Sequence, residues 1–169
     1  HHRRIQRQRL WSYVACKRDQ KLMIDIQPLE YKYWDQVQDL INKHKGPNPE
    51  TITYEEWTSQ SQCHMHIALD GDTVVGMIVH MIETNPRGGK ICWISDLLVA
   101  KGYGYSKGLG QAGDTAKRLF DTGTALAHKH KCYKQHATCT EVHAKLYKKW
   151  GLEVVGVNVM RMTNPNSSK

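Results

Sequence analysis

A glycine-rich turn between a strand and a helix is the segment of this sequence whose residue types best suit ligand chemistry. The hydrophobic pattern predicts a strand over residues 91–99, and residues 102–110 then read Gly-Tyr-Gly-Tyr-Ser-Lys-Gly-Leu-Gly before a helix begins near Gln111. Glycine lets a ligand approach the backbone closely, and free amide groups at a helix start attract negative charge. The turn therefore predicts a cradle for a pyrophosphate group, with Lys101 and Lys107 adding positive charge.

Two histidine clusters contain the residue types of metal ligands without the usual spacing. Residues 63–66 read Cys-His-Met-His, and residues 128–132 read His-Lys-His-Lys-Cys. In a strand, His64 and His66 face the same side, which would permit metal binding. No closed four-ligand pattern is present, however, and histidines on a half-buried strand are more often structural. We therefore expect no metal site.

Hydrophobic periodicity supplies the elements that must position the turn. A first strand is predicted over residues 22–29, then a helix over 30–45 and a short helix over 53–60, where Thr53 and Glu56 form a capping box. The later elements are predicted strands over 64–69, 73–82 and 91–99, a helix from about 111 to 131, a strand over 135–140, a helix over 141–150 and a strand over 152–162. Short turns join the three middle strands, which predicts antiparallel pairing and a mixed α/β protein.

Positive charge is concentrated at the start of the chain. The net charge is +8 over 169 residues; residues 1–22 contribute +6 through seven basic residues and one acidic residue, and residues 23–169 contribute +2. A basic arm of this kind can bind a nucleic-acid backbone through charge alone, or it can be a solvated extension. We treat residues 1–22 as a basic N-terminal extension that is native or partly a tag, 23–162 as one domain and 163–169 as a flexible tail.

Composition indicates a cytoplasmic protein without a membrane segment. No apolar run approaches the roughly 20 residues that span a bilayer, and no apolar stretch follows the basic start as in a signal peptide. The five cysteines form no paired framework, which suits a reducing compartment. Nothing in the sequence decides between a monomer and a homodimer.

The turn and its flanks resemble the GNAT acyltransferase superfamily. The resemblance is carried by Asp-Leu-Leu-Val at 96–99, by the turn at 105–110 and by residues 144–156, Ala-Lys-Leu-Tyr-Lys-Lys-Trp-Gly-Leu-Glu-Val-Val-Gly. In that family the turn reads Arg/Gln-x-x-Gly-x-Gly/Ala, and the later segment reads Asn-x-x-Ala-x-x-Leu-Tyr-x-x-x-Gly-Phe. A second register, with residues 102–104 as the Gly-x-Gly, also fits locally but shortens the spacing from the strand.

Three residues depart from the family pattern. Tyr105 stands where the family usually has Arg or Gln, Glu141 replaces the common Asn, and Leu152 replaces the common Phe. A tyrosine cannot supply the positive charge of the usual arginine, so the cradle is left to backbone amides.

The resemblance also implies a fold and a co-substrate. It implies a central mixed, mostly antiparallel sheet of six to seven strands with about four flanking helices. The sheet splays between the fourth and fifth strands to admit the pantetheine arm of acetyl-CoA, and the turn holds the pyrophosphate. The residues that the resemblance assigns to acyl-CoA binding are Leu97, Leu98, Val99, Tyr105, Ser106, Lys107, Gly108, Leu109, Gly110 and Gln111.

The same resemblance suggests catalytic residues. Tyr147 matches the family tyrosine that often protonates the departing CoA thiolate. For the general base, Asp96 ranks first because a lone carboxylate in an apolar strand is costly unless it is partnered or functional. Glu83 ranks second, His80 and Glu56 are further candidates, and ordered water is the alternative to a residue.

Two functions follow from these observations. The first is an N-acyltransferase, which passes an acetyl group from acetyl-CoA to a primary amine on a small molecule or a protein by direct attack in a ternary complex. The second is a catalytically altered GNAT-like module that binds nucleic acid or modifies its bases, with residues 1–22 as anchor. The first is the leading hypothesis, and the departures at Tyr105 and Glu141 give the second some support.

Overall fold

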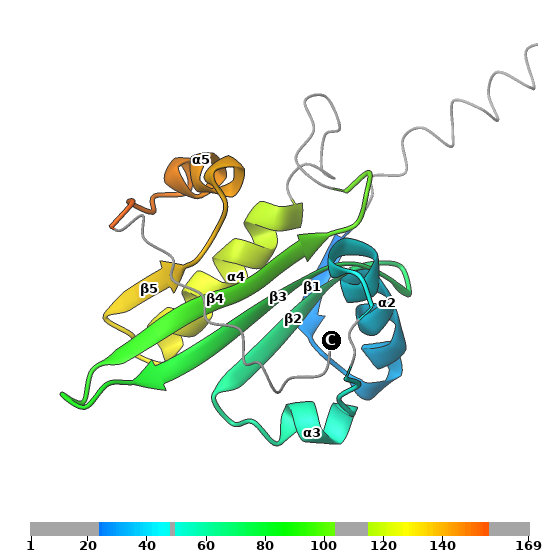
Figure 1. The fold of residues 1–169 in the computed structure, drawn as a ribbon, viewed down its shortest axis with the longest axis horizontal. Coiled ribbons are helices and arrows are strands. Elements are labelled where there is room, and N and C mark those ends of the chain that lie inside the picture. The colour runs from blue at the N-terminus through cyan, green and yellow to red at the C-terminus, as the bar shows by residue number, and fades with distance from the viewer. Residues whose placement is uncertain (1–23, 48–49, 104–114, 156–169) are drawn as a thin grey trace, which may run out of the picture.

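The computed structural model describes residues 24–47, 50–103 and 115–155 (Figure 1). Within these ranges, one five-stranded sheet has the strand order β1-β2-β3-β4-β5. The basic arm, the C-terminal tail and the predicted acyl-CoA residues Tyr105–Gln111 lie outside the described residues. Within the described ranges, the sheet and the helices on its two faces position the candidate site.

The three middle strands form an antiparallel meander, the first strand pairs antiparallel with its edge, and the fifth joins the other edge in parallel. The strands are β1 (Ile24–Pro28), β2 (Cys63–Asp70), β3 (Thr73–Thr84), β4 (Lys90–Val99) and β5 (Lys134–Ala137). The two-residue loop between β2 and β3 needs a left-handed residue, and Gly71 supplies it with φ 60°. This confirms the antiparallel meander that the short turns predict.

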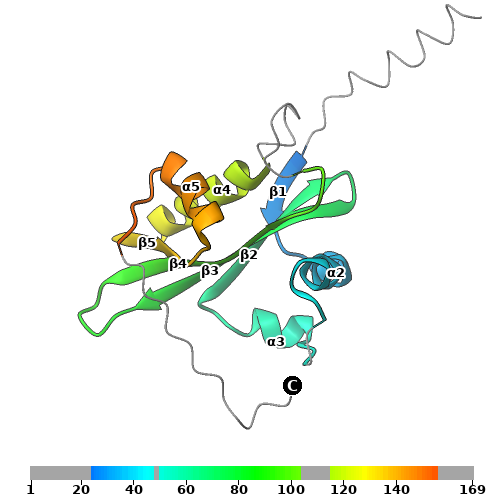
Figure 2. The same cartoon turned by 45° about the horizontal axis from the view of Figure 1, so that its top comes forward.

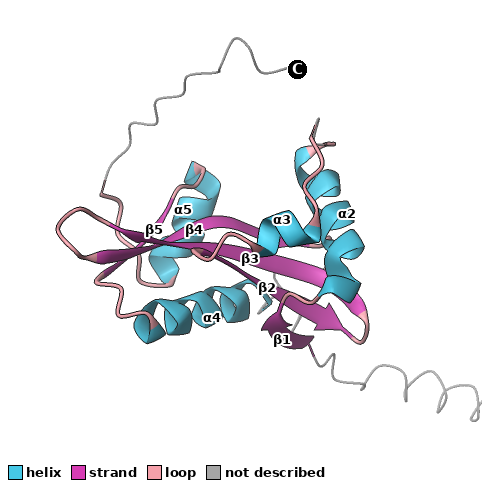
Figure 3. Ribbon diagram, turned by 90° about the horizontal axis from the view of Figure 1, so that it is seen from below, coloured by secondary structure: helices cyan, strands magenta, loops and turns pink. Residues whose placement is uncertain are grey.

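Helices cover both faces of the sheet. They are the 3₁₀ turn η1 (Tyr31–Tyr33) with α2 (Trp34–Lys45), α3 (Tyr54–Thr58), α4 (Thr115–Lys129) and α5 (Glu141–Lys149). Figures 2 and 3 show α2 and α3 on one face and α4 on the opposite face. The predicted capping box of α3 is present: the amide of Glu56 donates to Thr53 Oγ1 at 3.1 Å, and the Thr53 amide donates to Glu56 Oε2 at 2.8 Å.

The core consists of two clusters separated by the sheet. On one face Val37 and Leu40 of α2 pack with β-strand residues such as Met77. On the other, Leu119 and Phe120 of α4 are the centre of the second cluster. Because β3 is covered on both faces, its residues from Val74 to His80 are all buried, and the strand reads as a continuous apolar run instead of an alternating one.

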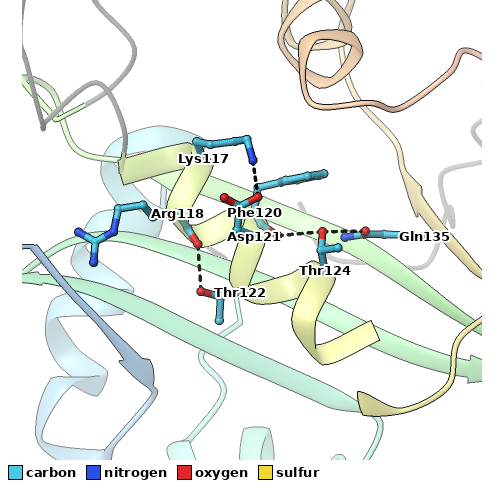
Figure 4. A network of polar contacts seen from close by, with 7 residues as sticks. All are labelled: Lys117, Arg118, Phe120, Asp121, Thr122, Thr124 and Gln135. Carbon is cyan, nitrogen blue, oxygen red and sulfur yellow. Dashed lines mark hydrogen bonds and ion pairs between the residues drawn. The ribbon is translucent and has the colours of Figure 1, made fainter. Parts of the chain in front are cut away.

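Polar contacts fix α4 against both edges of the sheet. Thr124 Oγ1 donates to Gln135 Oε1 of β5 at 3.1 Å (Figure 4). At the other end of the helix, Arg118 Nη1 donates to the carbonyl oxygen of Ile24 in β1 at 2.7 Å. The helix therefore spans the sheet from β1 to β5.

Element boundaries differ from the sequence predictions mainly near the C-terminus. The strand predicted over 135–140 ends at Ala137, where its pairing with β4 stops. Residues 152–155, the start of the predicted last strand, carry no strand structure, and the remainder of that strand lies outside the described residues. The described sheet thus has five strands where six to seven were expected, and its mixed architecture is as predicted.

Candidate active site

The sheet opens between β4 and β5, as expected for the fourth and fifth strands. β5 pairs with β4 only from Ile91 to Ile94, and β4 then continues to Val99. Figure 1 shows β4 running on beyond β5. Among the described residues, the stretch from Asp96 to Val99 pairs with β3 and has no strand on its other side. An extended ligand could pair with this edge as an added strand, although the carbonyl oxygen of Val99 already contacts His44.

A β-bulge marks the point where the sheet opens. Val79 of β3 is opposite Asp96, but the next residue, His80, is opposite Ile94, so Ser95 is the extra residue of β4. One extra residue reverses the alternation of side chains along a strand. Ile94 faces α4, and without the bulge Asp96 would do the same. With the bulge, Asp96 faces α2.

Asp96 is paired with a lysine from α2. Its carboxylate forms an ion pair with the ammonium of Lys45, and the two side chains are 32% and 50% exposed, respectively. The ion pair meets the cost of placing a carboxylate in an otherwise apolar strand. Asp96 is therefore partnered and still accessible at the opening of the sheet.

The last turn of α2 lies against the unpaired end of β4. His44 Nε2 is 3.0 Å from the carbonyl oxygen of Val99, and His44 Nδ1 is 2.9 Å from the carbonyl oxygen of Leu40. Lys45 is the last residue of the helix, which ends where Gly46 takes φ 81°. The sequence analysis missed Lys45 and His44, because basic residues in the last turn of a helix are common and carry no signal of their own.

Tyr147 of α5 belongs to the α4 side of the opening. Its side chain is 8% exposed, and its ring lies 5.9 Å from the ring of Phe120 and 5.7 Å from that of Trp150. Burial raises the pKa of Tyr147 to about 12, with smaller electrostatic contributions from Cys139 and Asp96. The hydroxyl is therefore protonated at neutral pH.

The other candidate bases lie away from Asp96 and Tyr147. Glu83 is opposite Ile91 at the far end of β4, five residues or about 16 Å from Asp96 along the strand. It accepts a hydrogen bond from Trp93 Nε1 at 2.9 Å. The carboxylate of Glu56 is used in the capping box of α3. Asp96 is thus at the open end of β4 on the α2 side of the sheet, Tyr147 is in the cluster on the α4 side, and Glu83 is at the opposite end of the strand pair.

His80 is enclosed beneath α4. It is fully buried, neither ring nitrogen has a hydrogen-bond partner among the described residues, and burial lowers its pKa to about 4. It lies directly against Gly123, where an added Cβ would be 1.7 Å from His80 Nε2. Its position excludes contact with a substrate at the opening, and the histidine is part of the core.

The first predicted histidine cluster lies next to His80. His64 is directly opposite His80, and the ring centroids of His64 and His130 are 5.1 Å apart. Burial lowers the pKa of His64 and of His66 as well. No set of three or more His, Cys, Asp or Glu side chains suited to a metal ion occurs in the described parts of the chain. The absence of a metal stays a prediction.

Comparison with known proteins identifies the family of this chain. Residues 29–152 match the acetyltransferase (GNAT) family. A sequence comparison with curated proteins gave no match. None of the helices in the described ranges has the length and apolar character needed to cross a membrane.

Solved acetyltransferase structures have the same fold. An acetyltransferase from Trypanosoma brucei has a TM-score of 0.71 at 16% identity, covering 84% of this chain and all (100%) of that one. Glucosamine-6-phosphate N-acetyltransferase from Arabidopsis thaliana has a TM-score of 0.68 at 15% identity, covering 84% and 99%. An aminoglycoside N-acetyltransferase, AAC(6')-Iy, in complex with CoA has a TM-score of 0.69 at 12% identity, covering 83% and 95%. At these identities the likeness shows the fold.

Proposed function

The chain belongs to the acetyltransferase (GNAT) family, and on that premise we propose that it transfers an acetyl group from acetyl-CoA to a primary amine by direct attack in a ternary complex. The observation that carries the proposal is the unpaired end of β4, with Asp96 on its α2 side and Tyr147 on its α4 side. This arrangement offers an edge for an extended ligand, a carboxylate for an amine and a phenol for a leaving sulfur.

The co-substrate is held by backbone groups. The pantetheine arm adds to the free edge of β4 like another strand, through the backbone of Leu97, Leu98 and Val99. The pyrophosphate lies on the turn Tyr105–Gln111, where amides replace the arginine that the family usually supplies. This placement brings the thioester to the opening between β4 and β5.

The amine enters from the α2 side. Asp96 binds the ammonium form and takes one of its protons, and the lone pair of the resulting neutral amine then attacks the carbonyl carbon of the thioester. A carbon–nitrogen bond forms, and the carbon–sulfur bond then breaks to release the CoA thiolate. Asp96 is supported in this role by its partial exposure at the opening of the sheet and by its existing contact with an ammonium group.

Tyr147 stabilises the departing sulfur as a hydrogen-bond donor. A phenol with a pKa of about 12 is a weaker acid than an ordinary thiol, whose pKa is about 8.5, and complete proton transfer to the thiolate is uphill by about 5 kcal/mol. A hydrogen bond to the developing charge carries no such cost. The proton that finally resides on sulfur therefore comes from the attacking amine.

Thermal unfolding with acetyl-CoA and a panel of amines tests the proposal. At 100 times its Kd, a ligand that binds only the folded state stabilises it by about 2.7 kcal/mol, which raises the Tm of a chain of this size by about 5–10 °C. Acetyl-pantetheine, which lacks the pyrophosphate, is the control and should give a smaller shift. The panel contains an aminoglycoside, an amino sugar phosphate and a lysine peptide, and CoA release identifies the acceptor class.

Substitution within the turn separates binding from chemistry. Gly108→Val adds a branched side chain where the backbone must approach the pyrophosphate, so the acetyl-CoA shift should disappear. An undiminished shift would refute the cradle. No shift with the unsubstituted chain and no CoA release with any amine would refute the acetyltransferase proposal.

A further inference from the structure

A primary amine of the chain already occupies the carboxylate that the proposed function assigns to the acceptor. Lys45 Nζ forms an ion pair with Asp96 across 51 positions of sequence. We propose that Lys45 is a site of self-acetylation, modified within the same molecule by acetyl-CoA bound at the opening of the sheet. The inference rests on the proposed function, because it uses the same acetyl donor and the same carboxylate.

The placement of Lys45 is set by the docking of α2 on β4. The imidazole of His44 contacts the carbonyl oxygen of Val99 at 3.0 Å, which holds the last helical turn at the unpaired end of β4. Lys45 follows directly, and its side chain reaches Asp96 three residues earlier on that strand. The amine is therefore presented along the stretch of β4 that the thioester is proposed to follow.

This ion pair differs from its counterparts elsewhere in the described chain. Lys32 pairs with Glu30 and Lys117 pairs with Asp121, each within four positions on the surface. The Lys45 pair alone among these three links two distant elements, and it does so next to the opening. Both of its side chains are partly exposed, so water can solvate the separated charges and the contact can open at a small cost in stability.

The reaction has the same balance as transfer to an external amine. The nitrogen of Lys45 attacks the thioester carbon, a carbon–nitrogen bond forms, the carbon–sulfur bond breaks and CoA leaves. Of the two protons that the ammonium loses, one ends on the sulfur and the other departs through Asp96. The product amide is neutral, so the ion pair is lost and Asp96 becomes free to bind the ammonium of another acceptor.

Peptide mass spectrometry of the full chain incubated with acetyl-CoA tests the proposal. Lys43 is the matched control, because it is exposed on the same turn but points away from Lys45. We expect Lys45 to gain an acetyl group at least about tenfold faster than Lys43, since a neighbouring base and a held thioester accelerate the attack. The rate constant should not change with protein concentration, as for a reaction within one molecule.

Three variants distinguish enzymatic labelling from chemical labelling. Asp96→Asn and Tyr147→Phe should each lower the labelling of Lys45 about tenfold or more and leave that of Lys43 unchanged. Lys45→Arg retains a cation for Asp96 and cannot be acetylated. It should keep the Tm of the unsubstituted chain and lose the labelled peptide, which shows that any loss is not a folding defect.

Each result decides for or against the proposal. Equal labelling of Lys45 and Lys43, labelling that Tyr147→Phe does not lower, or a rate that rises with protein concentration would overturn it. Release of CoA with an external amine while Lys45 stays unmodified would overturn self-acetylation and leave the proposed function standing. Absence of both the acetyl-CoA thermal shift and any transfer would remove both.

Discussion

The two halves of β4 place the same kind of backbone in two different environments. From Ile91 to Ile94, the closed half, the strand is paired on both sides, by β3 and by β5. From Asp96 to Val99, the open half, it is paired with β3 within the described residues. The bulge at Ser95 separates the halves and also turns the side chains over. One strand can therefore complete a core at one end and present chemistry at the other.

The polar side chains next to the two halves differ accordingly. His80, opposite Ile94, is buried and has no hydrogen-bond partner in the described part of the chain, whereas Asp96 is partly exposed and paired with Lys45. Substitutions at the closed half should change the free energy of unfolding, and substitutions at the open half should change turnover. The following experiments test this division.

The largest effect on turnover is expected from Tyr147→Phe, on the helix α5 beside the open half of β4. Loss of a hydrogen bond to the departing sulfur should lower kcat about 100-fold with little change in acetyl-CoA affinity. The Tm should stay nearly constant, because phenylalanine keeps the ring contacts with Phe120 and Trp150. Steady-state kinetics and a thermal shift measure the two quantities, and an unchanged kcat would remove Tyr147 from the mechanism.

The next effect is expected on stability, from Gly123→Ala. Gly123 is on α4 and contacts His80, which is opposite Ile94 of the closed half. Alanine favours a helix over glycine by about 1 kcal/mol, but here its Cβ would be 1.7 Å from His80 Nε2. The overlap forces α4 or His80 to move, and we expect the free energy of unfolding to fall by about 3 kcal/mol in urea denaturation. Thr122→Ala, one position earlier in the helix, is the control and should cost less than about 1 kcal/mol. A more stable Gly123→Ala variant would contradict the packing of His80.

Acidification should lower folding stability through His80, which lies beside the closed half of β4. Because burial lowers the pKa of folded His80 to about 4, the unfolded chain binds a proton there at a higher pH than the folded chain does. Folding stability should therefore fall as the pH is lowered from 7 to 5, by about 2 kcal/mol from this residue. His80→Leu should remove that share of the pH dependence in urea denaturation. A variant with the full dependence would assign the effect to other groups.

Sequence reasoning succeeded where the physics is local. The capping box joins Thr53 to Glu56 within one turn, and Gly71 sits where a two-residue hairpin requires its conformation. The glycine-rich motif is also a short pattern, but its predicted ligand role falls on residues outside the described ranges and stays a prediction. These features depend on neighbouring residues, so they can be read from the chain itself.

The remainder of the site depends on distant residues. Lys45 and Asp96 are 51 positions apart, and the contact between His80 and Gly123 joins a strand to a helix. Nor did any residue type signal the bulge at Ser95, although it alone turns Asp96 from α4 to α2. A carboxylate in an apolar strand is costly, and this cost singles out Asp96 over Glu83 in the sequence. Its partner Lys45 is visible only in the folded structure.

The smallest effect is expected from Glu83→Gln, and it tests the division most directly. Glu83 was the second candidate base, yet it lies at the closed half and accepts a hydrogen bond from Trp93. Glutamine keeps an oxygen acceptor for that bond, so the free energy of unfolding should change by less than about 1 kcal/mol. The kcat should stay within about twofold, whereas Asp96→Asn should lower it more than tenfold. A large loss of kcat in Glu83→Gln would mean that an acceptor reaches the closed half, and the division of β4 into a structural and a chemical half would be wrong.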